Sequence, residues 1–267
     1  LRPQKFIIPG LTAFGAIKFC SDRNYDEPAF DKANGQMYNF YAGWNHGFHY
    51  KSIEDMITSK SVTNLHMSAQ PENSQAKDGQ RGKILKFEQL RLPDQAFNMG
   101  VGVYNNKVRA IDYYGKTYRD HHFALKNKNA DSAFEALGDT AVIDRDWLNM
   151  FNNNTNHTEL FFKDTTKPYA PQSQNFDSGH PKRRFYAASM FNLRSTVLLD
   201  GRCDLYASGL VTVAMPEATA SEDGTSRAVS KFGGTWLVES VTHVITRETH
   251  QTKLELLKNK ATTSVSK

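Results

Sequence analysis

The feature that most constrains the fold is a run of alternating residues near the end of the sequence, at 232–259. From Trp236 to Arg247, successive positions alternate between two sets, and β-branched residues are dense. This pattern is typical of a long β-strand with at least one buried face. Gly233 and Gly234 stand just before it and free the backbone to bend into the strand at a sheet corner.

A second strand is predicted to return along the first. Residues 247–250 are expected to form the turn between them. In the return strand Leu254 and Leu256 fall on one face, and the positions between them fall on the other. The stretch therefore predicts a β-hairpin, with Trp236 as a core residue at the start of its first strand.

This hairpin resembles the last β-barrel hairpin of baseplate hub proteins from contractile-tailed bacteriophages. The shared features are a Gly before a "TWLV" strand, a "V-x-H-x-I" core and a "T-x-L-x-L-x-K-N" return strand, which together occupy residues 234–259 here. The hub segment of the type VI secretion spike protein is similar in the same barrel. The resemblance implies a structural protein of a phage tail.

Two further stretches resemble the same hub proteins, in the same order along the chain. A predicted helix at about 12–23 precedes an aromatic hairpin at 36–51, which runs into a short helix capped by Ser52. Residues 95–125 then predict a helical turn, a strand, a tight turn and a second strand. The hub-like residues of this third stretch are Gly102, Tyr104, Lys107, Asp112, Lys116 and Tyr118.

Together these patterns predict an α+β protein, in which a mixed α/β domain is followed by a small antiparallel β-barrel like that of phage tail hubs. The expected parts are the α/β domain at 1–125, an irregular loop-rich segment and linker at 126–182, and the barrel at 183–262. A hairpin turn at Asp200-Gly201 and a strand at 210–216 bring the barrel to about five strands, enough for a small one.

The remaining stretches carry weaker signals. Residues 60–93 receive no assignment from the resemblance. Short helices are predicted at 131–137, 146–151 and 185–191, and a polar loop, expected to be the most mobile part of the barrel domain, at 217–231.

Composition indicates a globular protein rather than a membrane or nucleic-acid-binding one. Hydrophobic residues make up 39% of the chain and charged residues 23%, and no apolar run reaches the length of a membrane helix. The net charge of +5 is spread over single Lys and Arg residues, so no specific nucleic-acid site is predicted. Cys20 and Cys203 are predicted to be free, buried thiols in preference to a disulfide.

No catalytic, cofactor-binding or metal-binding residue is predicted. His121 and His122 are adjacent, so on a strand they would point to opposite faces and could not chelate one metal ion. His46 and His49 are interpreted as structural residues of the aromatic hairpin. The carboxylate pairs Glu54/Asp55 and Asp144/Asp146 could form a glycosidase dyad, but each is better explained as a helix start.

The resemblance implies a non-enzymatic hub protein of the virion tail baseplate, assembled in the cytoplasm of a host bacterium. Hub proteins of this kind are trimers with two similar barrels per subunit, joining the sixfold tail tube to the threefold spike. Expected partners are therefore further copies of the chain, the tail tube and spike proteins, and baseplate wedge proteins. Since the sequence has one evident barrel and does not begin with Met, a first barrel is expected upstream of Leu1.

Two alternatives remain open at this point. One is a tail-associated cell-wall hydrolase that uses a carboxylate from 126–182. The other is a carbohydrate-binding β module, suggested by the 12% of aromatic residues, with Trp44 as a candidate contact.

Overall fold

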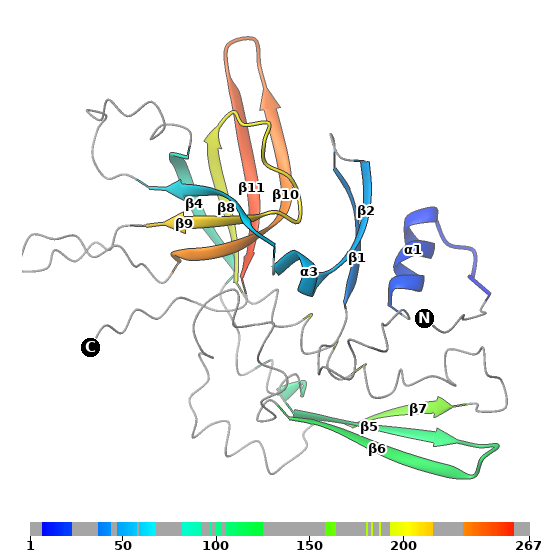
Figure 1. The fold of residues 1–267 in the computed structure, drawn as a ribbon. Coiled ribbons are helices and arrows are strands. Elements are labelled where there is room, and N and C mark those ends of the chain that lie inside the picture. The colour runs from blue at the N-terminus through cyan, green and yellow to red at the C-terminus, as the bar shows by residue number, and fades with distance from the viewer. Residues whose placement is uncertain are drawn as a thin grey trace, which may run out of the picture. The chain divides into compact units, whose positions relative to one another are not determined.

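The computed structural model describes residues 7–22, 37–43, 47–57, 59–67, 82–91, 97, 100–102, 105–124, 158–163, 180, 183, 187, 193–215 and 232–258. The chain, whose helices and strands are labelled in Figure 1, divides into two compact units, each made of several stretches of sequence. The first comprises residues 1–55, 94–133 and 143–188. The second comprises residues 56–93, 134–142 and 189–267.

The first unit begins with helix α1 (Ala13–Ser21), close to the helix predicted at 12–23. Thr12 caps it, because the Thr12 Oγ1 atom accepts a hydrogen bond from the Gly15 N–H at 3.2 Å. Phe14 on this helix lies against Phe40, with 5.8 Å between the ring centroids.

The predicted aromatic hairpin forms as strands β1 (Tyr38–Gly43) and β2 (Gly47–Ser52). Cross-strand ring pairs hold it together, as expected for facing aromatic residues in an antiparallel pair. These pairs stack at centroid distances of 5.0 Å for Tyr38–Tyr50, 5.6 Å for Phe40–Phe48 and 5.2 Å for Tyr41–His49. Helix α3 (Ile53–Ile57) follows, and Ser52 caps it as predicted, with its Oγ atom accepting from the Asp55 N–H at 3.2 Å.

A three-stranded sheet holds the third hub-like stretch. Strand β5 (Asn105–Asp112) lies between β6 (Thr117–Ala124) and β7 (Thr158–Lys163). The β5–β6 pair is the antiparallel hairpin that the sequence predicted, and the carboxylate of Asp112 holds its turn by accepting from the N–H groups of Tyr114 and Gly115. Strand β7 runs parallel to β5 and comes from the segment that was expected to be irregular.

The second unit is a six-stranded sheet that curls around its own core (Figure 1). Its strand order is β3-β9-β10-β11-β8-β4, and four of the five neighbouring pairs are antiparallel, with β3–β9 parallel. The strands are β3 (Ser61–His66), β4 (Ile84–Arg91), β8 (Leu193–Asp200), β9 (Leu210–Ala214), β10 (Gly234–Ile245) and β11 (His250–Lys258). The closing hairpin of the sequence thus supplies the two central strands.

Trp236 occupies the centre of this core. Its side chain is fully buried, and its Nε1–H donates to the carbonyl oxygen of Phe232 at 2.8 Å, so the one polar atom of the ring is satisfied. Phe87 of β4 meets the ring edge-on at 6.4 Å. Because β4 is an outer strand and β10 a central one, this contact spans the concave side of the curled sheet.

Lys258 is the other large, fully buried side chain beside Trp236. Its Nζ atom donates to the carbonyl oxygen of Gly233 at 2.6 Å and lies 5.5 Å from the centroid of the Trp236 ring. A buried ammonium group needs such partners, because an uncompensated charge in a low-dielectric core is strongly destabilising. The contacts join the last residue of β11 to the residues that lead into β10.

The two outer strands of the sheet meet at one point. The His66 N–H at the end of β3 donates to the Gly82 carbonyl oxygen at 2.8 Å, and His66 forms an isolated bridge with Lys83 just before β4. A Cβ atom on Gly82 would lie 2.3 Å from the backbone oxygen of Asn64, so only glycine allows this approach.

Several expectations need correction. The described residues are mostly β with two short helices, whereas a mixed α/β domain was expected before the barrel, and the expected antiparallel barrel is a curled half-barrel sheet with one parallel pair. The hairpin expected at Asp200-Gly201 does not form, since residues 202–206 make no strand and β8 pairs with β11 and β4 instead. Cys20 and Cys203 are free thiols as predicted, but Cys20 is only half-buried and Cys203 is exposed.

The curled sheet extends beyond the range expected for the barrel, because β3 and β4 come from the unassigned stretch 60–93. As domain boundaries, 1–125, 126–182 and 183–262 stay a prediction. The helices predicted at 131–137 and 146–151 and the loop at 217–231 lie outside the described residues, as does all of 185–191 except Ala187.

Gly82→Ala tests the meeting point of β3 and β4. The added methyl group forces the two backbones apart, and we expect a loss of about 1–3 kcal/mol in the free energy of unfolding. Chemical denaturation measures it, with Gly10→Ala as the control, because a Cβ there has open space around it. Equal stability of the two variants would show that β3 and β4 are not held together at Gly82.

Trp236→Ala tests the core. Removing a fully buried indole leaves a cavity, and we expect destabilisation of about 3–5 kcal/mol. Phe48→Ala is the matched control, since that ring is 72% exposed and its loss should cost less than about 1 kcal/mol. A loss below about 1 kcal/mol for Trp236→Ala in urea denaturation would contradict a core role.

Candidate assembly surface

The β10–β11 hairpin, which carries the strongest sequence resemblance, has two parts with different neighbours. β9 pairs with its first part, Gly234–Leu237, and hydrogen bonds between Val238 and the residues before β9 extend the contact by one position. The register of β10 against β11 then shifts between Val238 and Ser240. Beyond this bulge, within the described residues, residues 240–245 pair with β11 alone; we call them the distal edge of β10.

The distal edge is partly apolar and extends past β9. Figure 1 shows β10 running on beyond β9 beside β11, and β8 pairs with the other side of β11 as far as Gln251. Val244 and Ile245 near its end are 46% and 73% exposed. Exposed β-branched side chains on an open strand edge are a feature of surfaces that another chain covers.

The turn at the tip is ordered by one side chain. Thr246 Oγ1 accepts hydrogen bonds from the N–H groups of Thr249 at 3.0 Å and Glu248 at 3.4 Å. The Thr246 N–H donates to the Thr249 carbonyl oxygen at 2.8 Å. These hydrogen bonds close the turn at the end of the hairpin.

Two histidines meet across the ribbon. The His250 Nε2 and His243 Nδ1 atoms are 3.2 Å apart, and the buried hydroxyl of Thr252 lies 3.3 Å from the same Nδ1 atom. A Cβ atom on Gly201 would lie 2.1 Å from the His250 ring. Only glycine therefore fits at this position, where the chain leaves β8 beside the ring.

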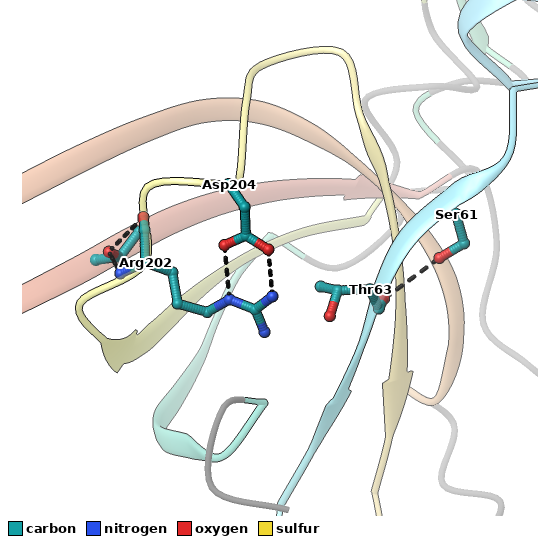
Figure 2. A network of polar contacts seen from close by, with 5 residues as sticks. Ser61, Thr63, Arg202 and Asp204 are labelled. Atoms are coloured by element: carbon teal, nitrogen blue, oxygen red, sulfur yellow. Dashed lines mark hydrogen bonds and ion pairs between the residues drawn. The ribbon is translucent and has the colours of Figure 1, made fainter. Parts of the chain in front are cut away.

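The β8–β9 loop is attached to β11 beside this histidine pair. The Arg202 N–H donates to Thr252 Oγ1 at 2.9 Å, and that hydroxyl donates back to the Arg202 carbonyl oxygen at 3.3 Å. Figure 2 shows the Arg202 guanidinium and the Asp204 carboxylate facing each other as a two-pronged pair, with Nε to Oδ1 at 2.9 Å. The pair fixes the shape of the loop, because a bidentate contact defines the orientation of both groups.

β3 is anchored to β9 at its first residue. Figure 2 also shows the Ser61 hydroxyl directed at the Thr63 carbonyl oxygen, at 3.3 Å. The same hydroxyl lies 3.2 Å from Thr212 Oγ1 on β9. These contacts cover the bulge between Ser61 and Thr63, where the β3–β9 register shifts.

A charged cluster lies across β8, β10 and β11 on the convex side of the sheet. The Arg194 guanidinium contacts both Glu239 and Glu255, at 2.9 Å each. Partial burial raises the pKa of Glu239, and the neighbouring Glu255 adds to the increase while Arg194 opposes it. Two carboxylates therefore share one cation here.

The three-stranded sheet of the first unit has its own exposed face. The register places Phe162 and Tyr118 on either side of Ile111, and the Tyr113 ring stacks on Phe162 at 5.5 Å. Tyr113, Tyr114 and Tyr118 are each 69% exposed. Aromatic side chains gathered on an open face are typical of binding surfaces.

Charges next to this aromatic face are paired with one another. Arg109 binds Asp120 through two contacts of 2.8 and 2.9 Å and lies 5.4 Å from the Tyr118 ring centroid, and Lys107 reaches the same carboxylate at 2.7 Å. Hydrogen bonds from Arg109 and Lys107 hold the pKa of Asp120 well below its usual range.

The residues considered for chemistry do not converge in the described parts of the chain. His121 is half-buried and His122 exposed on β6, and their register partners are Val108 and Lys107. His49 stacks on Tyr41 within the aromatic hairpin. Within the residues that the structure describes, no three His, Cys, Asp or Glu side chains gather as metal ligands.

Other candidates lie outside the described residues, namely His46, Trp44, Asp144 and Asp146, and the side chain of Glu54 does too. None of the helices in the described stretches has both the length and the apolar character needed to cross a membrane.

Comparison with known proteins found no matching family model and no matching curated protein. Among solved structures, the chain is similar to the tail protein from Neisseria meningitidis MC58, with a TM-score of 0.43 and 10% sequence identity. The similarity covers 95% of this chain and 56% of that one. The chain thus spans just over half the length of that tail protein.

Sequence reasoning missed the strands that complete the curled sheet. β3 and β4 lie on either side of the polar stretch 68–82, which drew attention away from them. In β3, Val62, Asn64 and His66 alternate with Thr63 and Leu65, so polar residues fall on both faces and the strand pattern is weak. β7 was missed because it is a parallel strand of six residues without a hairpin turn beside it. The apolar and β-branched residues clustered in these short runs were the signal that could have predicted the strands.

Glu239→Gln tests the charged cluster through its pH dependence. Because the pKa of Glu239 is higher in the folded than in the unfolded protein, its ionised form lowers the free energy of unfolding at high pH. This loss of stability disappears when the pH falls below the pKa of the unfolded chain, about 4.3. We expect the variant to be more stable than the wild type at pH 7, by a few tenths of a kcal/mol, roughly the scale of partly exposed ion pairs. The difference should vanish near pH 4.

Thermal unfolding at pH 4 and pH 7 measures this, with Glu88→Gln as the control. Lys86 lowers the pKa of Glu88, so that change should give no gain at pH 7. A Glu239→Gln variant that is less stable than the wild type at pH 7 would show that the attraction to Arg194 outweighs burial.

Proposed function

We propose that this chain is a structural protein of a phage tail, and more specifically of the baseplate hub. In this role three copies form a ring that joins the tail tube to the central spike, with baseplate wedge proteins around it. The protein would then reside in the virion tail after assembly in the cytoplasm of a bacterial host.

The observation that carries the proposal is the position of the closing hairpin. The residues that resemble the hub family form the two central strands of a curled sheet, and Trp236 of the "TWLV" strand fills its core. The other two resembling stretches form the β1–β2 and β5–β6 hairpins that the resemblance implied. Three separate motifs of the sequence thus form the hairpins that the resemblance to hub proteins implies, which supports the proposal.

The exposed surfaces suit a protein that neighbours complete. The curled sheet leaves the distal edge of β10 open within its described residues, and the face of the β5–β6–β7 sheet exposes several tyrosines. A ring forms when one surface of a subunit contacts a different surface of the next and the rotation closes. Each subunit of such a ring needs two contact surfaces of this kind.

One alternative function has an observation in its favour. The exposed rings of Tyr113, Tyr114 and Tyr118, next to the fixed Arg109–Asp120 pair, could line a carbohydrate-binding surface. Glycan-array binding that Tyr114→Ala abolishes would support a carbohydrate-binding module. The hydrolase alternative depends on residues 126–182, of which the structure describes only 158–163 and His180, and clear lysis in a peptidoglycan zymogram would favour it over a hub protein.

The hub proposal predicts the oligomeric state. Light scattering should give three times the mass of the polypeptide that is measured, once all hub surfaces are present. We expect a trimer for the chain extended through its reading frame, and a smaller mass for the chain alone, because a stable interface needs roughly 1,000 Å² or more. An extended chain that stays monomeric at high concentration would contradict the trimeric hub.

A further inference from the structure

Strand edges of the six-stranded sheet differ in how they are protected against pairing with another chain. Natural proteins guard an edge with charged side chains, with bulges or by covering it, because an unguarded row of N–H and C=O groups pairs with any suitable strand. Among the described residues, the sheet has two outer strands, β3 and β4, and a third open edge where β10 runs past β9.

β4 and β3 are both protected. β4 has register shifts at Ile84/Lys86 and Gln89/Arg91, and it carries the ion pair of Lys86 with Glu88. β3 has a bulge after Ser61, and its last residue is bridged to Lys83. β4 therefore carries charge and two irregularities, whereas β3 is uncharged but short, with a bulge at one end and a bridge at the other.

In the part of the chain that the structure describes, the distal edge of β10 has neither charged side chains nor a register shift within it. Residues 240–245 contain no Asp, Glu, Lys, Arg or Pro, and their pairing with β11 runs without a shift from Ser240 to Ile245. Val244 and Ile245 are exposed on it. A regular, uncharged and partly apolar edge in an otherwise guarded sheet indicates a place where a strand is received.

The first part of the same strand shows what kind of strand fits. β10 takes β9 along Gly234–Leu237, in antiparallel register and with the sequence Leu-Val-Thr-Val-Ala, which is uncharged and rich in β-branched residues. The distal edge continues that line of backbone groups after one bulge. A helix does not present such a row of outward N–H and C=O groups, and the uncharged edge offers nothing to phosphate, so an extended polypeptide is the matching ligand.

We propose that the distal edge of β10 is a strand-addition site that receives an extended, uncharged, β-branched strand from another polypeptide, running antiparallel to β10 as β9 does. Backbone hydrogen bonds provide the binding energy, and Val244 and Ile245 supply apolar contacts to alternate side chains of the incoming strand. The inference comes from register and edge chemistry, and it holds whether or not the chain is a hub protein.

The test uses the whole chain and a synthetic peptide with the sequence of residues 209–215, capped at both ends. Hydrogen exchange is measured at each amide of β10 with and without the peptide. At a peptide concentration of about ten times its dissociation constant, the outward amides among residues 240–245 should exchange roughly tenfold more slowly. A peptide of the same sequence, N-methylated at every residue, keeps the side chains but cannot donate hydrogen bonds and should give no protection.

Thr242→Lys is the matched protein variant, because a lysine on a strand edge opposes strand addition. It should abolish protection by the peptide, and Val244→Lys should do the same if Thr242→Lys fails to fold. Leu90→Lys, on an exposed position of β4, is the control and should leave peptide protection unchanged.

Protection confined to residues 240–245 and lost in the Thr242→Lys variant would support the proposal. Absence of protection at millimolar peptide, or equal protection by the N-methylated peptide, would overturn it. If the amides of residues 240–245 become protected without peptide as the protein concentration rises, and Thr242→Lys removes this protection, the partner is a second copy of the chain. That result would overturn the proposal of a separate polypeptide. A trimer that forms normally with Thr242→Lys would leave the hub proposal standing while showing that this edge is not its ring contact.

Discussion

The curled sheet depends on how the Trp236 side chain is buried. An indole in a core is stabilising only if its N–H finds an acceptor, and here the Phe232 carbonyl oxygen accepts it. The Lys258 ammonium lies over the same ring and donates to Gly233, so the chain entering β10 is tied to the end of β11. Phe87 adds a contact from β4, which brings an outer strand of the sheet to its centre.

Other features follow from this central arrangement. With β10 and β11 fixed as a pair, β8 and β9 add on either side, and β3 and β4 complete a sheet whose outer strands meet at Gly82. The sheet draws on residues as far apart as 61 and 258, so its formation requires many contacts between distant parts of the chain. The part of β10 that extends beyond β9 has an open edge among the described strands.

Several charged groups on the described surfaces are paired with each other. Arg194 serves two carboxylates on the convex side of the curled sheet, Arg109 and Lys107 both bind Asp120, and Arg202 binds Asp204. Such contacts add little stability when exposed, but they fix the position of side chains and loops. Val244 and Ile245 on β10 and the tyrosines near the β5–β6 turn are among the exposed side chains that could contact other molecules.

Local patterns in the sequence determined the hairpins, the caps and the core residue at their centre. Alternation at 236–258, the aromatic runs at 38–50 and the turn after Asp112 predicted three antiparallel pairs, and Ser52 and the indole of Trp236 took the roles expected of them. Each of these rests on neighbours in sequence, whose spacing is visible in one chain. The resemblance to hub proteins rests on the same local motifs.

Tertiary structure alone decided which strands complete each sheet. Asp200-Gly201 favours a tight hairpin locally, yet β8 pairs with β11 and β4, because burial of Val197 and Leu199 against the shared core outweighs the turn preference. The parallel partners β3 and β7 have no turn signal, since parallel strands are joined through distant segments. The open edge of β10 likewise depends on where β9 ends, which is a property of the folded sheet and leaves no mark in the alternation of residues 236–247.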